Sequence, residues 1–252
     1  MLHTPQPTQN LLLKMLQEIG ELSIFSQLEL VRLPQGKLLY DNTKLTPYSY
    51  FPTTAAISMF FEKNYNVDYK GVVVEIETIR NDGMLSLPAI LESQDISRAV
   101  VQSTGYAYRI ETNLLQNEIQ RNNILLKILL KYLQLRISKL AQMSVCSRFH
   151  SAEQQISRVL LNMLDYSPVN TIEITHKMIA DKLNLRRECV TLNLSNLQRQ
   201  GIVLTRRGKL SILRRDELEK LCCECYKVII HETEHLLNQR NRAATVTNNN
   251  NM

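Results

Sequence analysis

The chain has 252 residues, of which 44% are hydrophobic and 21% charged, with a formal net charge of +6 at pH 7. This length fits two modest domains better than one. Its most apolar run, 124–130, is interrupted by Lys127 and is far shorter than the roughly 20 residues that a membrane span needs. The composition therefore excludes a membrane protein, and no membrane partner is expected.

Three of the five cysteines are crowded together at 222, 223 and 225. An odd number in this arrangement is a poor disulfide framework, which excludes a disulfide-stapled secreted domain and favours the reducing cytoplasm. The first ten residues contain no basic segment followed by an apolar stretch, so no secretory signal is expected. We therefore expect a cytoplasmic protein.

In chain order, residues 11–30 predict one or two short helices, because apolar residues recur every three or four positions. From residue 33 to about 111, short apolar or alternating runs are separated by turn residues. Residues 72–77 alternate as a half-buried strand should. Many short strands without long intervening helices predict an antiparallel sandwich or a barrel-like roll.

Residues 113–145 predict one helix of about thirty residues with two apolar stripes. Asn122 and Arg136 fill two gaps in the first stripe. One stripe is expected to pack on the helix's own domain. For the other, the same helix of a second subunit is the economical partner, since most soluble oligomers are symmetric. A helix buried inside a monomer is the alternative.

The carboxyl-terminal part predicts further helices over 151–164 and 216–238, with a short strand near Ile172. Ser151 and Gln154 occupy capping-box positions before the first of these helices. The Asn-rich tail at 239–252 has little to bury and is expected to be disordered.

Residues 175–201 have the spacing of a helix-turn-helix. Thr175 can cap a short helix, and the small Ala180 allows a second helix to approach closely. Asn184 stands at the turn, where it tolerates a left-handed conformation. Val190, Leu194 and Leu197 follow as the buried side of a second helix over 186–200. Residues 202–213 then predict a hairpin with a basic tip, which is a wing.

Residues 171–215 contain ten basic and three acidic side chains, so this segment carries +7 while the rest of the chain is nearly balanced. A local excess of this size fits double-stranded DNA as partner. A helical wheel places Glu188 and Leu192 opposite the buried side and Thr191 beside them, and Arg186 and Arg187 occupy the first turn, which reaches base edges in such motifs. These five residues are the candidates for base reading. Six candidates for phosphate contact flank them: Lys177, Ser195, Arg199, Arg206, Arg207 and Lys209. The alternative is a protein-interaction module with a solvated charged face.

From about Gly36 to Tyr226 the chain resembles the Crp/Fnr family of bacterial transcription regulators. The segment 187–191, Arg-Glu-Cys-Val-Thr, is similar to the family's recognition helix, in which the Arg and Glu read bases. Leu192 stands where the best-known members have Arg. The runs at 50–52, 81–84, 146–150 and 223–226 are similar to a branch of the family. The resemblance implies an α+β chain with an antiparallel, cyclic-nucleotide-binding-like β-roll (1–112), a long dimerisation helix (113–145) and a winged helix-turn-helix domain (146–238).

The same resemblance bears on the effector. Nucleotide-binding members have a Gly-Glu pair and a later Arg, but here Gly83 is followed by Met84, with Arg98 further on. These three residues are the candidates for an effector pocket. Without the carboxylate that holds the ribose, cyclic AMP binding is not expected, no cofactor is identified and the effector stays unnamed. Because no cysteine precedes Cys146, an amino-terminal iron–sulfur cluster is excluded as well.

Two groups of residues invite other interpretations. Cys222, Cys225, His231 and His235 have spacing similar to a zinc motif, but on one continuous helix the two pairs would lie about two turns apart. We therefore expect no metal site. Cys146 and His150 could form a nucleophile and base, but no third orienting group or oxyanion loop accompanies them. The chain is therefore not expected to be an enzyme and has no catalytic residues.

The sequence thus predicts a homodimeric DNA-binding regulator that reads a pseudo-palindromic operator, with RNA polymerase as a further partner. A ligand-binding regulatory module that acts through protein–protein contacts is the alternative.

Overall fold

The computed structural model describes residues 4–19, 23–41, 47–63, 72–85, 90, 97–167 and 169–238. The chain divides into two compact units, one formed by residues 1–136 with residues from 235 onward, and one by residues 137–234. Each unit is described by itself. No helix in the described parts of the chain has the length and apolar character needed to cross a membrane.

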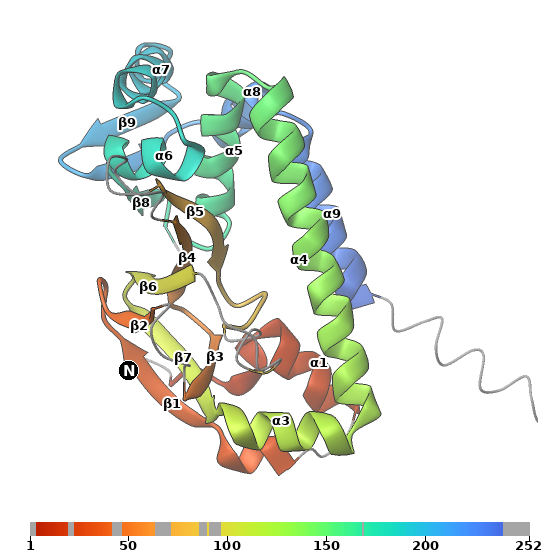
Figure 1. Cartoon of the computed structure of the whole chain (residues 1–252). Coiled ribbons are helices and arrows are strands. Elements are labelled where there is room, and N and C mark those ends of the chain that lie inside the picture. The colour runs from red at the N-terminus through yellow and green to blue at the C-terminus, as the bar shows by residue number, and fades with distance from the viewer. Residues whose placement is uncertain are drawn as a thin grey trace, which may run out of the picture. The chain divides into compact units, whose positions relative to one another are not determined.

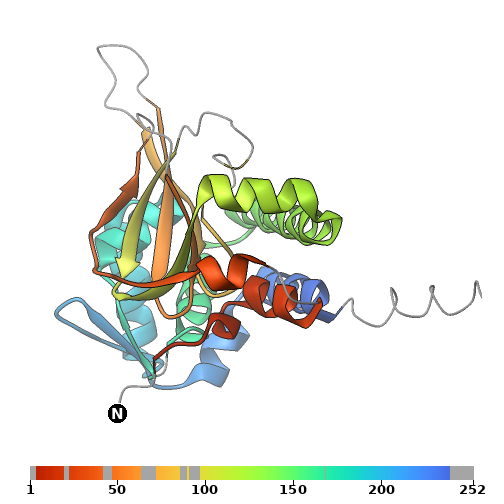
Figure 2. The same cartoon turned by 90° about the horizontal axis from the view of Figure 1, so that it is seen from below.

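Two antiparallel sheets form the centre of the first unit (Figures 1 and 2). One sheet has the order β1-β7-β3, with bounds Glu29–Leu33, Gly105–Glu111 and Tyr48–Pro52. The other has the order β2-β6-β4-β5, with bounds Leu38–Tyr40, Ser97–Ser103, Ala56–Lys63 and Val72–Ile79. Leu33 and Ala107 of the first sheet share a buried core with Ile57 and Val101 of the second. This arrangement confirms the predicted antiparallel β-roll.

A glycine allows the link between the two sheets to form. The β6 strand ends at Ser103, and β7 starts at Gly105, where an added Cβ would lie 2.4 Å from the backbone nitrogen of Ala55. A side chain at this position cannot be accommodated without moving the backbone. Gly105 therefore permits the close passage of β7 beside residues 54–55.

Helices pack against one end of the roll, and they share a second core. They include α1 (Leu11–Ile19), α3 (Thr112–Arg121) and the first part of α4 (Asn123–Phe149); the 3-10 turns η1 (Pro7–Gln9) and η2 (Ser23–Gln27) lie on either side of α1 in the sequence. The buried Asn10 starts α1, because its Oδ1 accepts from the N–H groups of Leu12 and Leu13. Its amide also donates to the carbonyls of Pro52 and Gly83, which fastens α1 to the roll.

The expected single helix over 113–145 is wrong at Asn122. There the backbone leaves the helical region, with φ −127° and ψ 99°, and α3 ends. The Asn122 Oδ1 accepts from the N–H groups of Ile124 and Leu125, so this side chain caps the start of α4. The second helix then continues to Phe149, four residues beyond the expected end.

The second unit is a winged helix-turn-helix domain. Its helices and strands after α4 are α5 (Ala152–Leu164), β8 (Thr171–Glu173), α6 (His176–Leu183), α7 (Arg187–Arg199), β9 (Val203–Arg206), β10 (Lys209–Ile212), α8 (Arg215–Leu221) and α9 (Cys225–Asn238). The strands form an antiparallel sheet of order β8-β10-β9. Ser151 and Gln154 form the predicted capping box at the start of α5.

The expected continuous helix over 216–238 is also wrong. Residues 222–224 separate α8 from α9, and Cys222 has an extended backbone with φ −79° and ψ 149°. The break turns the chain so that Cys223 and Cys225 become buried beside Cys146. The Asn-rich tail at 239–252, which we expect to be disordered, lies outside the described residues.

Candidate nucleic-acid interface

Local hydrogen bonds build the helix-turn-helix. The Thr175 side chain accepts from the N–H of Met178 and caps α6. Asn184 ends this helix in the left-handed region, with φ 51° and ψ 42°. The N–H of Leu185 then donates to the carbonyl of Ala180 at 2.9 Å, which closes the turn. The predicted turn residue and cap are both confirmed, and α7 starts one residue after Arg186.

Burial divides α7 into two faces. Val190, Leu194 and Leu197 are at most 1% exposed and pack into the domain core with Ile179 and Ala180 of α6. All five base-reading candidates, Arg186, Arg187, Glu188, Thr191 and Leu192, are exposed on the other side. Leu192, the one large apolar side chain among them, is 61% exposed. The outward face of α7 is thus a surface on which base edges could be read.

His176 is a neighbour of this face that the sequence did not point out. Thr191 Oγ1 donates to the carbonyl of Arg187 at 3.0 Å, so its oxygen is able to accept from the Nδ1 of His176, also at 3.0 Å. Burial lowers the pKa of His176, and the positive charge of Arg187 lowers it further. A neutral imidazole therefore holds the Thr191 side chain in place. The only sequence signal for this role was its position directly after the cap of α6.

The wing follows from a two-residue turn. Arg207 and Gly208 both have positive φ, 36° and 80°, between the paired strands β9 and β10. Positive φ at both central positions is typical of a tight hairpin whose twist matches its strands. Gln198 of α7 accepts through Oε1 from the N–H of Thr205 at 3.0 Å. This bond couples the orientation of the wing to that of α7.

The six phosphate candidates are all exposed: Lys177, Ser195, Arg199, Arg206, Arg207 and Lys209. Two of them form surface ion pairs, Lys177 with Asp181 at 2.6 Å and Lys209 with Glu173 at 3.1 Å. Exposed pairs of this kind contribute at most about 1 kcal/mol. A phosphate can therefore replace the carboxylate at little cost. The structure brings these residues to the surface of one domain.

The α4 helix also carries an exposed apolar stripe. Leu126, Leu130, Ile137 and Leu140 are between 39% and 59% exposed, and their spacing of four, seven and three follows a heptad pattern. Other apolar residues of the helix, including Leu125, Ile128, Leu129, Tyr132 and Leu135, are buried. The two predicted apolar stripes of α4 therefore exist, one exposed and one buried.

The effector candidates lie in the first unit. Met84 is fully buried, and the Tyr132 hydroxyl is bonded to both its N–H and its carbonyl, at 3.1 and 3.2 Å. The same hydroxyl lies 2.3 Å from where a Cβ on Gly83 would be, so the Tyr132 side chain packs directly against the backbone at Gly83 and leaves no space for a side chain there. Arg98 lies over the ring of Phe60, 5.4 Å from its centroid. The effector pocket stays a prediction.

The cysteines and histidines are grouped differently from the two sets considered in the sequence. Cys225 lies with Cys146, His150 and Cys223, and their four ligand atoms are within 4.8 Å of one another. Burial would raise the pKa of Cys146, but the Arg158 charge and hydrogen bonds from His150 and Arg158 lower it overall. Cys222 lies outside this group, and burial raises its pKa to about 11.

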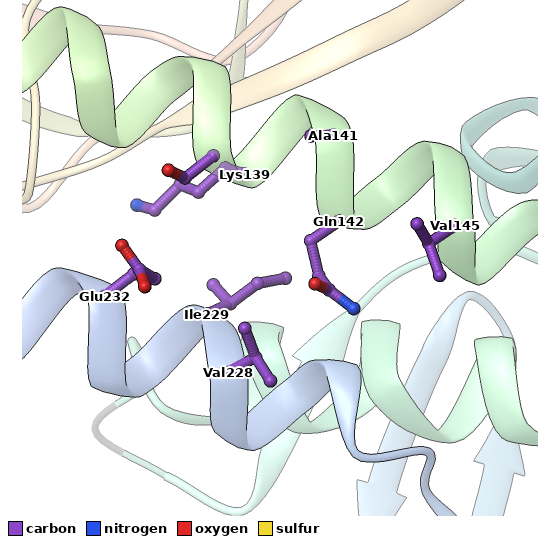
Figure 3. Close-up of a pocket in the computed structure, with 8 residues that line it drawn as sticks. Lys139, Ala141, Gln142, Val145, Val228, Ile229 and Glu232 are labelled. Carbon is purple, nitrogen blue, oxygen red and sulfur yellow. The ribbon is translucent and has the colours of Figure 1, made fainter.

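A small groove lies between α4 and α9 in the second unit (Figure 3). Val145, Val228 and Ile229 contribute apolar side chains, and Lys139 and Glu232 lie toward one end. Gln142 also lines the groove, and its amide donates to Cys225 Sγ at 2.9 Å. The groove therefore lies beside the cysteine group.

Comparison with known proteins connects this geometry to a family. Residues 154–221 match the Crp-like helix-turn-helix domain. A comparison with curated proteins found no significant match to this chain. Solved structures share the fold at low identity. FixK2 from Bradyrhizobium japonicum has a TM-score of 0.65 at 15% identity, covering 78% of this chain and 98% of that one.

Two more solved structures have TM-scores of 0.58. One is a transcriptional regulator of the CRP/FNR family from Thermus thermophilus, 17% identical, with coverage of 77% of this chain and 97% of that one. The other is the c-di-GMP responsive regulator CLP from Xanthomonas campestris, 15% identical, with coverage of 75% and 95%. These likenesses establish the fold, and the domain match establishes the helix-turn-helix.

Proposed function

We propose that the chain is a DNA-binding transcription regulator of the Crp/Fnr type and that it acts as a cytoplasmic homodimer on a pseudo-palindromic operator; the helix-turn-helix match and the shared fold support this. The proposal rests on the outward face of α7. Five exposed side chains there are suited to contact base edges, and the opposite face of the helix is buried. A helix of this kind enters the major groove and reads with its first turns.

Each exposed side chain of α7 has a chemical role in base reading. Arg186 and Arg187 can donate two hydrogen bonds to guanine, and Glu188 can accept from cytosine. Leu192 and the Thr191 methyl group can contact a thymine methyl, which would bury the exposed Leu192. We propose that the wing and the ends of the helices hold the phosphates through Lys177, Ser195, Arg199, Arg206, Arg207 and Lys209.

The homodimer is proposed from the exposed stripe of α4. Leu126, Leu130, Ile137 and Leu140 would be covered by the same residues of a second copy, as in a two-stranded coiled coil. Two recognition helices related by a two-fold axis then favour half-sites about one helical turn apart.

RNA polymerase is the further partner that we propose, since a regulator bound beside a promoter acts on transcription by contacting it. We propose no catalytic activity. Cys146 and His150, the pair suited to nucleophilic chemistry, lie in a group with two further cysteines and a buried Arg158. Cys146 is fully buried, so a substrate could reach its sulfur only if the surrounding groups moved.

A binding-site selection with the full chain tests the proposal. The expected product is an inverted repeat bound by the dimer. Each subunit has five cationic candidates for phosphate contact. If all ten in the dimer neutralise a phosphate, the logarithm of the binding constant should fall with the logarithm of the salt concentration with a slope of about −9. A slope near zero, or selection of a single asymmetric site, would contradict the proposal.

The alternative, a ligand-responsive module that acts through protein contacts, gives a different result in the same titration. It predicts no retention on duplex DNA at low salt, since its charged face would be solvated only. The exposed Leu192 is the observation that would suit a protein partner. The high local charge favours DNA instead.

A further inference from the structure

Four side chains that the proposed function does not use meet in the second unit. Cys146 lies near the end of α4 and His150 directly after it, whereas Cys223 lies in the link between α8 and α9 and Cys225 is the first residue of α9. The Sγ atoms of Cys146 and Cys223 are 3.6 Å apart, although the two residues are separated by 77 positions. His150 Nδ1 lies 3.4 Å from Cys225 Sγ.

These distances match the edges of a tetrahedron around one metal ion. Bonds of about 2.3 Å from zinc to sulfur and about 2.0 Å to nitrogen place ligand atoms about 3.8 Å and about 3.5 Å apart. The longest separation among the four atoms is 4.8 Å, so small side-chain rotations would close the remaining distance of about 1 Å. The three cysteines are at most 3% exposed, as in a closed structural site.

The surrounding groups complete an outer layer of contacts. His150 Nε2 is 3.2 Å from Glu224 Oε1, so a proton on Nε2 leaves the Nδ1 lone pair directed at the cysteines. Gln142 donates from Nε2 to Cys225 Sγ at 2.9 Å. Carboxylates behind metal-bound histidines and N–H donors beside thiolates are typical of zinc sites.

The positive charge of Arg158 is an independent reason to expect that cysteines of this group are present as thiolates. This guanidinium is 5% exposed, and Nε donates to Cys146 Sγ at 3.3 Å. Within the described residues, no carboxylate forms an ion pair with it. A buried cation needs a counter-charge. Three thiolates and one Zn²⁺ carry a net charge of −1, which Arg158 would neutralise.

We propose that the second unit contains a structural site for a single zinc ion, with four ligands: Cys146, His150, Cys223 and Cys225. On binding, the three thiols lose their protons to water and the sulfurs bond to the ion. The site would tie the end of α4 to the α8–α9 link and so stabilise the domain that holds the recognition helix. It is independent of DNA reading. Soft sulfur and imidazole donors favour zinc over the oxygen-binding cations.

Metal content of the full chain, purified without air or chelator and without an affinity tag that binds metal, is the first measurement. Roughly one zinc per chain is expected. Metal-free protein titrated with Co²⁺ should then develop the intense thiolate charge-transfer bands and the visible bands of a tetrahedral site. Protein that binds no Co²⁺ in this way would overturn the proposal.

Serine variants provide matched controls. Cys223→Ser is expected to abolish zinc retention, whereas Cys222→Ser, one position earlier and outside the group, is expected to leave it unchanged. Cys189→Ser on α7 is a second control. Zinc retained by Cys223→Ser, or lost from both controls, would contradict the ligand assignment.

A labelling experiment on the native chain does not depend on whether a variant folds. Zinc should protect three of the five cysteines from a maleimide, and a chelator should expose them. A disulfide between Cys146 and Cys223 in the chain as purified, with no zinc bound, would instead show a thiol switch and overturn the proposal. Iron with inorganic sulfide, or stoichiometric copper, would overturn the choice of metal.

Discussion

Replacing Arg187 by alanine removes the guanidinium at the start of α7 that we expect to read a base. Its side chain is exposed and makes no ion pair within the described parts of the chain, so folding should change little. A bidentate contact contributes about 1–3 kcal/mol of discrimination. Two subunits on a symmetric operator double this to about 2–6 kcal/mol, which is roughly 30-fold to 10⁴-fold in affinity.

The matched control is Lys209→Ala in the wing. Lys209 is 62% exposed and is paired with Glu173 at 3.1 Å, so its loss should change the free energy of unfolding by less than about 1 kcal/mol. It should reduce the salt slope by about 0.9 for each subunit, or about 1.8 for the dimer. All sequences should be weakened alike.

Fluorescence anisotropy on the selected operator and on duplexes with one base pair changed in each half-site separates the two effects. Arg187→Ala should bind the operator more weakly and lose its preference for one base pair in each half-site. Lys209→Ala should bind all duplexes more weakly and keep the same order of preference among them. If Arg187→Ala retains full discrimination at every position, the assignment of α7 as the reading helix is refuted.

Three further outcomes follow from the structure. Tyr132→Phe leaves the buried N–H and carbonyl of Met84 without the hydroxyl and should lower the free energy of unfolding by about 1–3 kcal/mol in urea denaturation; an unchanged value would contradict this account. Ile137→Glu, on a side chain 59% exposed, should shift the dimer to monomer in light scattering while thermal stability of the monomer stays the same; a retained dimer would remove α4 as the interface. Asn184→Val forces a β-branched residue to φ 51° and should cost about 1–2 kcal/mol, whereas Asn184→Gly should be nearly neutral; equal stability of the two variants would show that the turn relaxes.

The helix-turn-helix could be predicted because each of its signals is local. The cap at Thr175, the left-handed Asn184 and the buried spacing of Val190, Leu194 and Leu197 all act within one or two turns of helix. The hydrogen bonds that form these elements join near neighbours in the chain. The same holds for the two-residue turn of the wing. The outward face of α7 follows from this spacing, since the residues not buried must point away.

Helix boundaries at polar residues were harder to predict. In the sequence, Asn122 is compatible both with one helix that has a polar gap in its apolar stripe and with a break between two helices. The structure shows the break, in which the Asn122 side chain caps the next helix. Residues 222–224 have no strong preference against a helix. The chain nevertheless leaves the helix there, because Cys223 and Cys225 become buried in a small core with Cys146. In both places a contact outside the helix outweighs the modest intrinsic preference of the residues.

By itself, the sequence determined the architecture, the candidate reading helix and the concentration of positive charge in one segment, because periodicity, caps and composition are properties of short segments. Only the tertiary structure decided which of the cysteines and histidines meet. Cys146 and Cys223 lie 77 positions apart, and no spacing rule relates them. In the sequence, the cysteines crowded at 222–225 indicated only a reducing compartment. In the structure, packing of α4 against the α8–α9 link brings two of them together with Cys146 and His150, beside the buried Arg158.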